Sequence, residues 1–228
     1  MNNKEFWNRY KYLILFIIIF TISGVSIFNI ALTPEKKLPI YSPSMVSSDL
    51  VDDDLKHVKK YHKISDFNLV NQNGQETTQN NYDKKIYVAD FFFTTCPNIC
   101  PIMTGNMLFL QNELSDQDVM FASFSVTPEI DSVEVLKKYA IDKGVNDKKW
   151  NLMTGDKKQI YNLARKSFLV VKNNPQMDSH DMIHTENFVL VDKEKRIRGF
   201  YDGTKMEEMN KIISDIKILQ DSYNKSKS

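Results

Sequence analysis

Cysteine is scarce in this sequence, and neither sign of charge prevails. Two cysteines in 228 residues are too few for a scaffold held together by disulfides, which excludes that class of small secreted protein. The 30 basic and 29 acidic residues leave a formal net charge of +1. Because there is also no basic stripe with interleaved aromatic residues, nothing indicates a nucleic-acid partner.

The composition is that of a globular protein. Hydrophobic residues make up 42% of the chain and charged residues 26%, with 14 Phe and 10 Tyr. A disordered or low-complexity chain has a different balance. Roughly 150 residues remain when a membrane segment and two tails are set aside, which is enough for one domain with a hydrophobic core.

One long apolar run stands near the N-terminus. Residues 12–32 read YLILFIIIFTISGVSIFNIAL and carry no charge over 21 residues. At about 1.5 Å per residue, a helix of this length crosses the roughly 30 Å hydrocarbon core of a bilayer. Arg9 and Lys11 precede the run, and cationic residues favour the cytoplasmic side. We therefore expect a transmembrane anchor at 12–32 and a cytoplasmic N-terminus at 1–11.

A cleaved signal peptide is the alternative interpretation of this run. The run is longer than the apolar region of a typical signal peptide, and no clear A-x-A cleavage site follows it. The first ten residues contain Glu5 and little Ser or Arg, unlike an organelle transit peptide. The predicted location is a bacterial inner membrane, with a single span and the C-terminal domain facing the periplasm or the outer side.

Beyond the anchor, the chain divides into a linker, a domain and a tail. Residues 33–60 contain three prolines and an acidic run, which predicts an extended linker. The domain is expected at 61–219 and a flexible tail at 220–228. Strands alternate with helices in the domain, which predicts an α/β sandwich. The expected elements are a hairpin turning at Asn73-Gly74, strands at 85–93, 118–126, 187–192 and 196–201, a short segment at 150–153, and helices from Cys96, over 131–144 with a capping box, at 156–168 and at 205–219.

Cys96 and Cys100 stand where a strand leads directly into a helix, the layout of thioredoxin-like proteins. Residues four apart share one face of a helix, so both sulfurs could converge on one atom or bond each other. The positive end of the helix dipole lowers the pKa of a nearby thiol, so Cys96 is predicted to be the more acidic and more exposed of the two. A thiolate pair is a soft ligand set that favours Cu(I) and also suits Zn(II).

The remaining candidate ligands are the four histidines. His57 and His62 lie in charged surroundings and are interpreted as solvated surface residues. His184 comes just before the expected strand at 187–192, which places it at the same edge as the cysteines, although a lone histidine in a loop is more often structural or solvated. His180 has a helical metal-binding spacing to His184, but the segment does not look helical, so His180 is the weaker candidate.

Three segments of the chain resemble the Sco/SenC family: DFFFTTCPNICPIM, SVTPEIDSVEVLKKYA and DMIHTENFVLVD. The resemblance spans the anchor and nearly all of residues 60–215. It implies a membrane-anchored, thioredoxin-like protein that binds copper, as Cu(I) or Cu(II), and helps assemble the dinuclear copper centre of cytochrome c oxidase. Carried over residue by residue, it implies that Cys96, Cys100 and His184 are the copper ligands.

The same resemblance implies partners. They are the copper-accepting subunit of cytochrome c oxidase, and an upstream copper donor or thiol reductant. One departure is visible, because Thr127 stands where many family members carry Asp, whereas Asp131 is retained. An acid at the position of Thr127 would bear on partner docking or on the tuning of the site.

Two other functions of the same fold belong to different classes. A peroxiredoxin needs a Thr three residues before its reactive Cys, and Phe93 occupies that position here, which argues against it. A membrane-anchored thiol–disulfide oxidoreductase could use the cysteine pair to reduce partner cysteines by thiolate attack and resolution. His184 discriminates between the copper-binding and the reductase hypotheses, because a copper site needs it and a reductase does not. Met103 and Met107 have helical spacing and are interpreted as core packing rather than as thioether ligands.

Overall fold

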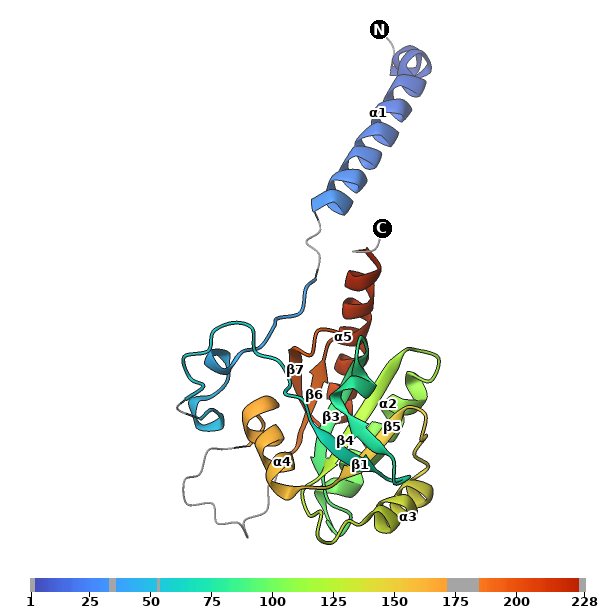
Figure 1. Ribbon diagram of the computed structural model, residues 1–228. Helices are drawn as coiled ribbons and strands as arrows, with labels where there is room; N and C mark the ends of the chain where they lie inside the picture. Colours follow the sequence, from blue (N-terminus) through green and yellow to red (C-terminus); the bar gives the residue numbers. More distant parts are fainter. Residues whose placement is uncertain (1–2, 33–35, 53, 172–184, 226–228) are drawn as a thin grey trace. The chain divides into compact units, whose positions relative to one another are not determined.

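The computed structural model describes residues 3–32, 36–52, 54–171 and 185–225. By its internal contacts the chain forms two units, Met1–Lys36 and Lys37–Ser228. The larger unit is built on one seven-stranded sheet with helices packed against it (Figure 1).

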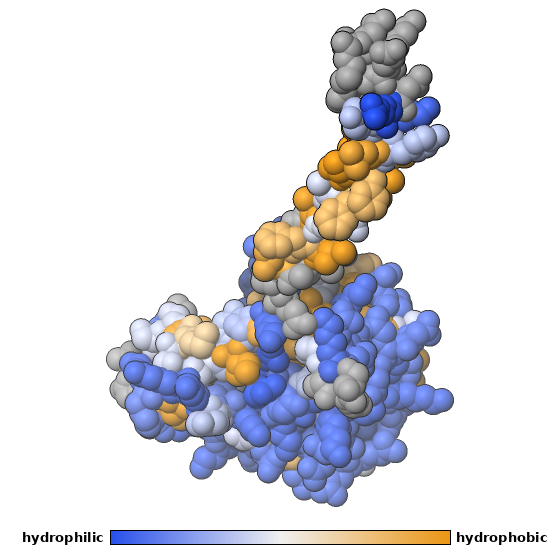
Figure 2. Space-filling view, turned by 90° about the horizontal axis from the view of Figure 1, so that it is seen from above, coloured by the Kyte–Doolittle hydropathy of each residue, from blue (hydrophilic) through white to orange (hydrophobic). Residues whose placement is uncertain are grey.

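The smaller unit contains helix α1, Asn3–Leu32. Within it, the segment Arg9–Phe28 has a mean hydropathy of 2.2 and is long and apolar enough to cross a membrane, a property that a signal sequence near an N-terminus shares. Figure 2 shows apolar side chains along this helix, while the visible face of the larger unit is mostly hydrophilic. The helix therefore fits the expected anchor at 12–32 in length and composition.

The sheet of the larger unit is mixed. Its three middle strands, β5, β4 and β3, run parallel, and the flanking strands pair antiparallel. The strand order is β2-β1-β5-β4-β3-β6-β7. The strands are β1 Asn68–Asn71, β2 Glu76–Thr78, β3 Ile86–Phe92, β4 Val119–Ser125, β5 Trp150–Thr154, β6 Asn187–Val191 and β7 Ile197–Asp202.

Helices cover both faces of the sheet (Figure 1). α2, α3 and α5 contribute to the core on one face, and α4 contributes to the core on the other. The expected α/β sandwich is therefore confirmed. The helices are α2 Ile99–Glu113, α3 Val133–Lys143, α4 Lys157–Asn162 with a π-helical continuation at Leu163–Ser167, α5 Met206–Lys225, and short 3-10 helices at Pro43–Met45, Ser48–Leu50 and Gln79–Tyr82.

β3 is the strand that leads to the cysteines. All seven of its residues are buried, as its nearly continuous apolar run predicts for a strand covered on both faces. Its side chains alternate, so that Val88 faces the core beneath α2 and Phe91 faces the core beneath α4. Packing from both sides holds the end of β3 at Phe92, from which the cysteine turn departs.

Two helix starts differ from expectation. α2 begins at Ile99 rather than at Cys96, and the side chain of Asn98 at its N-cap position makes no capping hydrogen bond. α3 begins after Ser132, whose Oγ accepts a hydrogen bond from the N–H of Val135 at 3.4 Å. The residue three positions after this cap is therefore Val135, and Glu134 instead accepts from the Ser132 hydroxyl. The expected capping box does not form, since Glu134 lies one position too early for it.

The expected flexible tail at 220–228 is partly helical. α5 runs to Lys225. Leu219 is fully buried, and the Tyr223 hydroxyl donates to the carboxylate of Glu194. These contacts hold the last turns of the helix against the domain, and composition alone does not reveal them.

The expected linker packs on the domain from Leu38 on instead of extending away from it. The N–H of Tyr41 donates to the carbonyl of Ile197 in β7 at 2.9 Å. Arg198 donates to the carbonyls of Leu38 and Pro39 at 2.7 and 2.8 Å. Because β7 is the last strand of the sheet, its outer backbone groups need such partners, and this segment supplies them.

Candidate functional site

Cys96 lies in the turn between β3 and α2, not on the helix as expected. β3 ends at Phe92 and α2 begins at Ile99. The N–H of Cys96 donates to the carbonyl of Phe93 at 3.4 Å and closes this turn. Cys100 lies in the first turn of α2. The turn, rather than a shared helix face, therefore brings the two cysteines together.

The sulfur of Cys96 faces the N-terminus of α2. The N–H of Cys100 donates to Cys96 Sγ at 3.4 Å. The two sulfurs are not bonded to each other, and Cys96 is half-buried whereas Cys100 is only 6% exposed. A metal ion or a partner thiol arriving from solvent therefore meets Cys96 first.

The two thiols differ in acidity. Burial acts to raise the pKa of Cys96, but hydrogen bonds from the N–H groups of Cys100, Asn98 and Ile99 favour the thiolate and bring this pKa below its ordinary value. Burial raises the pKa of Cys100 to about 12, and the neighbouring sulfur of Cys96 contributes in the same direction. The prediction that Cys96 is the more acidic and more exposed thiol is confirmed.

Asp90 is a buried carboxyl in the middle of β3. It is 3% exposed, and it accepts a hydrogen bond from the Ser123 hydroxyl. Burial raises the pKa of Asp90 to about 7, and the charge of Asp90 contributes to the raised pKa of Cys100. Sequence reasoning missed this residue. The available signal was an acid inside an otherwise apolar strand, which is costly to bury.

Asp90 is expected to make stability depend on pH. Its carboxyl has a pKa of about 7 when folded and 3.8 without the protein environment, so the folded state binds more protons between these values. Its contribution to the free energy of unfolding is therefore lost as pH rises from about 4 to about 7. The stability advantage of Asp90→Asn over the wild type should therefore grow by about 4 kcal/mol as the pH rises from about 4 to about 8. Urea unfolding at several pH values measures this, and a difference that does not change with pH would contradict it.

A third ligand is not found among the described residues. His184 and His180 lie outside them, and in the described ranges no group of three or more His, Cys, Asp or Glu side chains could hold a metal ion. β6 pairs antiparallel with β3, with Val189 opposite Ala89. The start of β6 at Asn187 therefore lies beside the end of β3, where the cysteine turn begins.

The other candidate ligands have structural explanations. His57 is exposed, as expected. His62 is not a solvated surface residue, because its Nε2 forms a hydrogen bond with the carbonyl of Ser167 at 2.7 Å and burial lowers its pKa. Met103 and Met107 are fully buried in the core beneath α2, which confirms that they serve packing.

Thr127, the departure from the family pattern, is also buried. It is 8% exposed, and its Oγ1 donates to Asp131 Oδ2 at 3.1 Å. In this chain the position is therefore part of an internal hydrogen-bond network rather than of an exposed docking surface.

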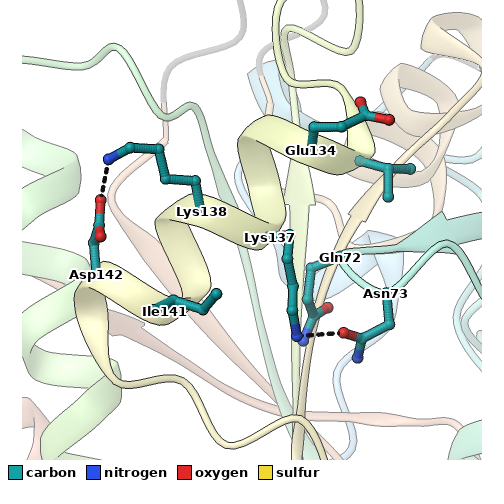
Figure 3. Close-up of a pocket in the computed structure, with 8 residues that line it drawn as sticks. Gln72, Asn73, Glu134, Lys137, Lys138, Ile141 and Asp142 are labelled. Atoms are coloured by element: carbon teal, nitrogen blue, oxygen red, sulfur yellow. Dashed lines mark hydrogen bonds and ion pairs between the residues drawn. The ribbon is translucent and has the colours of Figure 1, made fainter.

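A separate surface cavity of about 550 Å³ lies between α3 and the turn that joins β1 to β2 (Figure 3). Lys137 in this cavity is held by Asn73 at 2.6 Å and by Asp147 at 2.8 Å. Lys138 pairs with Asp142 at 2.5 Å. Neither cysteine lines the cavity, so it is not part of the candidate site.

Comparison with known proteins gives consistent matches. A sequence model of the SCO1/SenC family matches residues 55–220. The SCO1 protein homolog of Bacillus subtilis (strain 168) is 33% identical over 159 residues, which cover 68% of this chain and 82% of that protein. BsSco, described as a member of the Sco family of cytochrome c oxidase assembly proteins with a disulfide switch, has a structure with a TM-score of 0.60 and 33% identity, covering 69% of this chain and 93% of its own. Yeast Sco1 with copper bound has a TM-score of 0.55 and 25% identity, covering 69% of this chain and 90% of its own.

These similarities agree on the fold and on the part of the chain concerned. The structural matches confirm the expected thioredoxin-like α/β architecture. The matched range 55–220 is well over half of the chain and includes both cysteines. The chain therefore belongs to the SCO1/SenC family.

Proposed function

We propose that this chain is a copper-binding assembly factor for the dinuclear copper centre of cytochrome c oxidase, with Cys96, Cys100 and His184 as ligands. The observation that carries the proposal is the pair of unbonded cysteines at the start of α2, with Cys96 Sγ 3.4 Å from the backbone nitrogen of Cys100. Two thiolates and an imidazole suit both Cu(I) and Cu(II). Copper is the cargo of this site rather than a permanent cofactor.

The different acidities of the thiols suggest an order of capture. A metal ion binds the thiolate form, and the pKa of Cys96 is lowered in the direction of that form. Burial raises the pKa of Cys100 to about 12, so Cys100 loses its proton when a cation is already held next to it. Copper thus binds Cys96 first, and Cys100 follows with release of a proton.

The pairing of β6 with β3 supports His184 as the third ligand. β6 begins at Asn187 beside the end of β3, and His184 is three residues earlier in the sequence. His180 is four residues farther from this edge along the chain, which favours His184 as the imidazole ligand. An imidazole added to two thiolates gives the site a ligand that Cu(II) prefers more than Cu(I) does.

The relatives support copper as the metal and an oxidase as the destination. Yeast Sco1 holds copper in its structure, and BsSco belongs to a family of cytochrome c oxidase assembly proteins. The proposed partners are the copper-accepting subunit of cytochrome c oxidase and an upstream copper donor or thiol reductant. Helix α1 would anchor the domain at a bacterial inner membrane, with the domain on the periplasmic or outer side.

Copper titration tests this proposal. Anaerobic titration of the reduced full-length chain in detergent is expected to give one tightly bound Cu(I) per chain. His184→Ala is expected to weaken Cu(II) by at least the roughly 10- to 100-fold that loss of a supporting residue costs, and Cu(I) by less, because imidazole is a harder ligand than thiolate. Competition against chelators of known affinity for each ion measures both effects.

His57→Ala is the matched control, since this histidine is exposed and outside the cysteine turn. It should leave both affinities unchanged. Equal weakening of the two ions in His184→Ala would contradict the ranking of ligands. A larger loss in His180→Ala than in His184→Ala would show that the imidazole had been assigned to the wrong residue, and a wild-type chain without tight copper would refute the copper role.

A thiol–disulfide oxidoreductase is the second candidate, and the acidity difference favours it. Cys96 as thiolate would attack a partner disulfide, releasing one partner thiolate and forming a mixed disulfide. Cys100 would then attack the Cys96 sulfur, which releases the second partner thiol and leaves the pair oxidised. Normal thiol exchange in His184→Ala, together with no tight copper in the wild type, would favour this function over the first.

A further inference from the structure

Asp131 is a buried carboxylate that joins three segments of the domain. It is fully buried between the end of β4 and the start of α3. Its Oδ2 accepts hydrogen bonds from Ser125 Oγ at 2.5 Å and from Thr127 Oγ1 at 3.1 Å. The same oxygen accepts from the backbone N–H of Thr94 at 3.3 Å, and Oδ1 accepts from the Thr94 hydroxyl. Both carboxylate oxygens thus accept hydrogen bonds from the protein, as a buried carboxylate requires.

Thr94 is the link between this network and the cysteines. It stands two residues before Cys96, in the turn after β3, and gives Asp131 both its N–H and its hydroxyl. The second part of the same turn is closed by the bond from the N–H of Cys96 to Phe93. Because Cys96 precedes the helix, this turn decides how its sulfur faces the N–H of Cys100.

We propose that Asp131 is a positioning residue of the cysteine site, which sets the place of Cys96 Sγ relative to Cys100 by holding Thr94. Thr127 suits this arrangement, because its hydroxyl donates to Asp131 Oδ2. The same oxygen also accepts from the N–H of Thr94 and from the hydroxyl of Ser125. The part of the inference that concerns copper rests on the proposed function. The part that concerns the thiol pair does not, since the same geometry governs disulfide formation.

Two variants of the full-length chain test the proposal. Thr94→Val keeps the side-chain shape and the backbone N–H and removes only the hydroxyl bond, while Asp131→Asn replaces an acceptor by an amide that faces donors. Each should lower the affinity for Cu(I) by roughly tenfold, measured by chelator competition.

A second readout does not need copper. Oxidised glutathione and the reduced pair are in equilibrium with the Cys96–Cys100 disulfide and two reduced glutathione molecules, so electrons and protons balance. A turn that no longer holds Cys96 lowers the effective concentration of one thiol near the other. Each variant should therefore shift this equilibrium toward the reduced pair by about threefold or more.

Asp215→Asn is the matched control. Asp215 is also buried, accepts a hydrogen bond from the Tyr201 hydroxyl at 2.8 Å and lies on α5, so its replacement should lower stability and leave both readouts unchanged. If Thr94→Val and Asp131→Asn fold and match the wild type in both readouts, Asp131 only stabilises the fold and the proposal is wrong. Where Asp131→Asn does not fold, Thr94→Val decides. Where the wild type binds no copper, the proposed function fails and the glutathione equilibrium decides on Asp131.

Discussion

Replacing either cysteine by serine is expected to abolish tight Cu(I) binding. A serine hydroxyl is a hard ligand, so each variant loses one of the two soft thiolates on which Cu(I) depends. The loss in affinity should exceed the roughly 10- to 100-fold change that a supporting residue causes. Chelator competition with Cys96→Ser and Cys100→Ser, prepared separately under anaerobic conditions, measures it.

Met107→Leu is the control for this experiment. Met107 is fully buried in the same core as Cys100, and leucine has a similar volume, so the change should cost less than about 1.5 kcal/mol of stability. It should leave copper binding intact, since the thioether serves packing. A cysteine variant that still holds one Cu(I) as tightly as the wild type, or a Met107→Leu chain that loses it, would require a different ligand set.

Asp192→Ala is expected to cost about 3 to 5 kcal/mol of the free energy of unfolding. The carboxylate of Asp192 is fully buried and accepts from Arg196 Nε and from Arg198 Nη1, both at 2.8 Å. It also accepts from the backbone N–H groups of Glu194 and Arg196 at 3.0 Å. Its removal leaves these donors without their acceptor and leaves the largely buried guanidinium of Arg198 without its counter-charge. Urea unfolding of the full-length chain measures the loss.

Asp118→Ala is the matched control for Asp192→Ala. Asp118 pairs with Lys85 at 2.6 Å, but both side chains are substantially exposed, at 64% and 38%. Solvent screens such a pair, so the change should cost at most about 1 kcal/mol. Similar losses for the two variants would mean that burial does not determine how much Asp192 contributes to the free energy of unfolding.

Local patterns were enough to predict most of the sheet. The run at 85–93 predicted a strand covered on both faces, and β3 forms within it at 86–92 with every residue buried. The Asn73-Gly74 turn also follows from local chemistry, because Gly74 has a φ of +71°, which other residues adopt at a cost. Where a segment's structure depends on its own residues, the sequence was a sufficient guide.

Distant contacts explain where the predictions were wrong. The turn that carries Cys96 ahead of α2 is held by Asp131, which lies 37 residues beyond Thr94, and no local pattern indicates this bond. The docking of the linker depends on Arg198, 160 residues beyond Leu38, while the proline-rich composition by itself indicates an extended chain.

The sequence predicted some features of the candidate site and missed others. The order of acidity of the two thiols was predicted correctly, because the N–H groups at the helix start stabilise the Cys96 thiolate, as expected. The burial that raises the pKa of Cys100 was not part of that prediction. Asp90 and the network around Asp131 went unseen, because their roles come from burial in the folded chain. His184 comes from the family resemblance and stays a prediction until copper titration tests it.

The segment docked along β7 has a consequence for self-association. An uncovered edge strand is a template on which a second chain can add a strand and begin to aggregate. Here the N–H of Tyr41 donates to the carbonyl of Ile197, and Arg198 holds Leu38 and Pro39 beside β7. The same chain therefore covers this part of the sheet edge. A soluble fragment of this protein therefore needs to begin before Leu38, because a later start would remove the chain's own protection against sheet extension between copies.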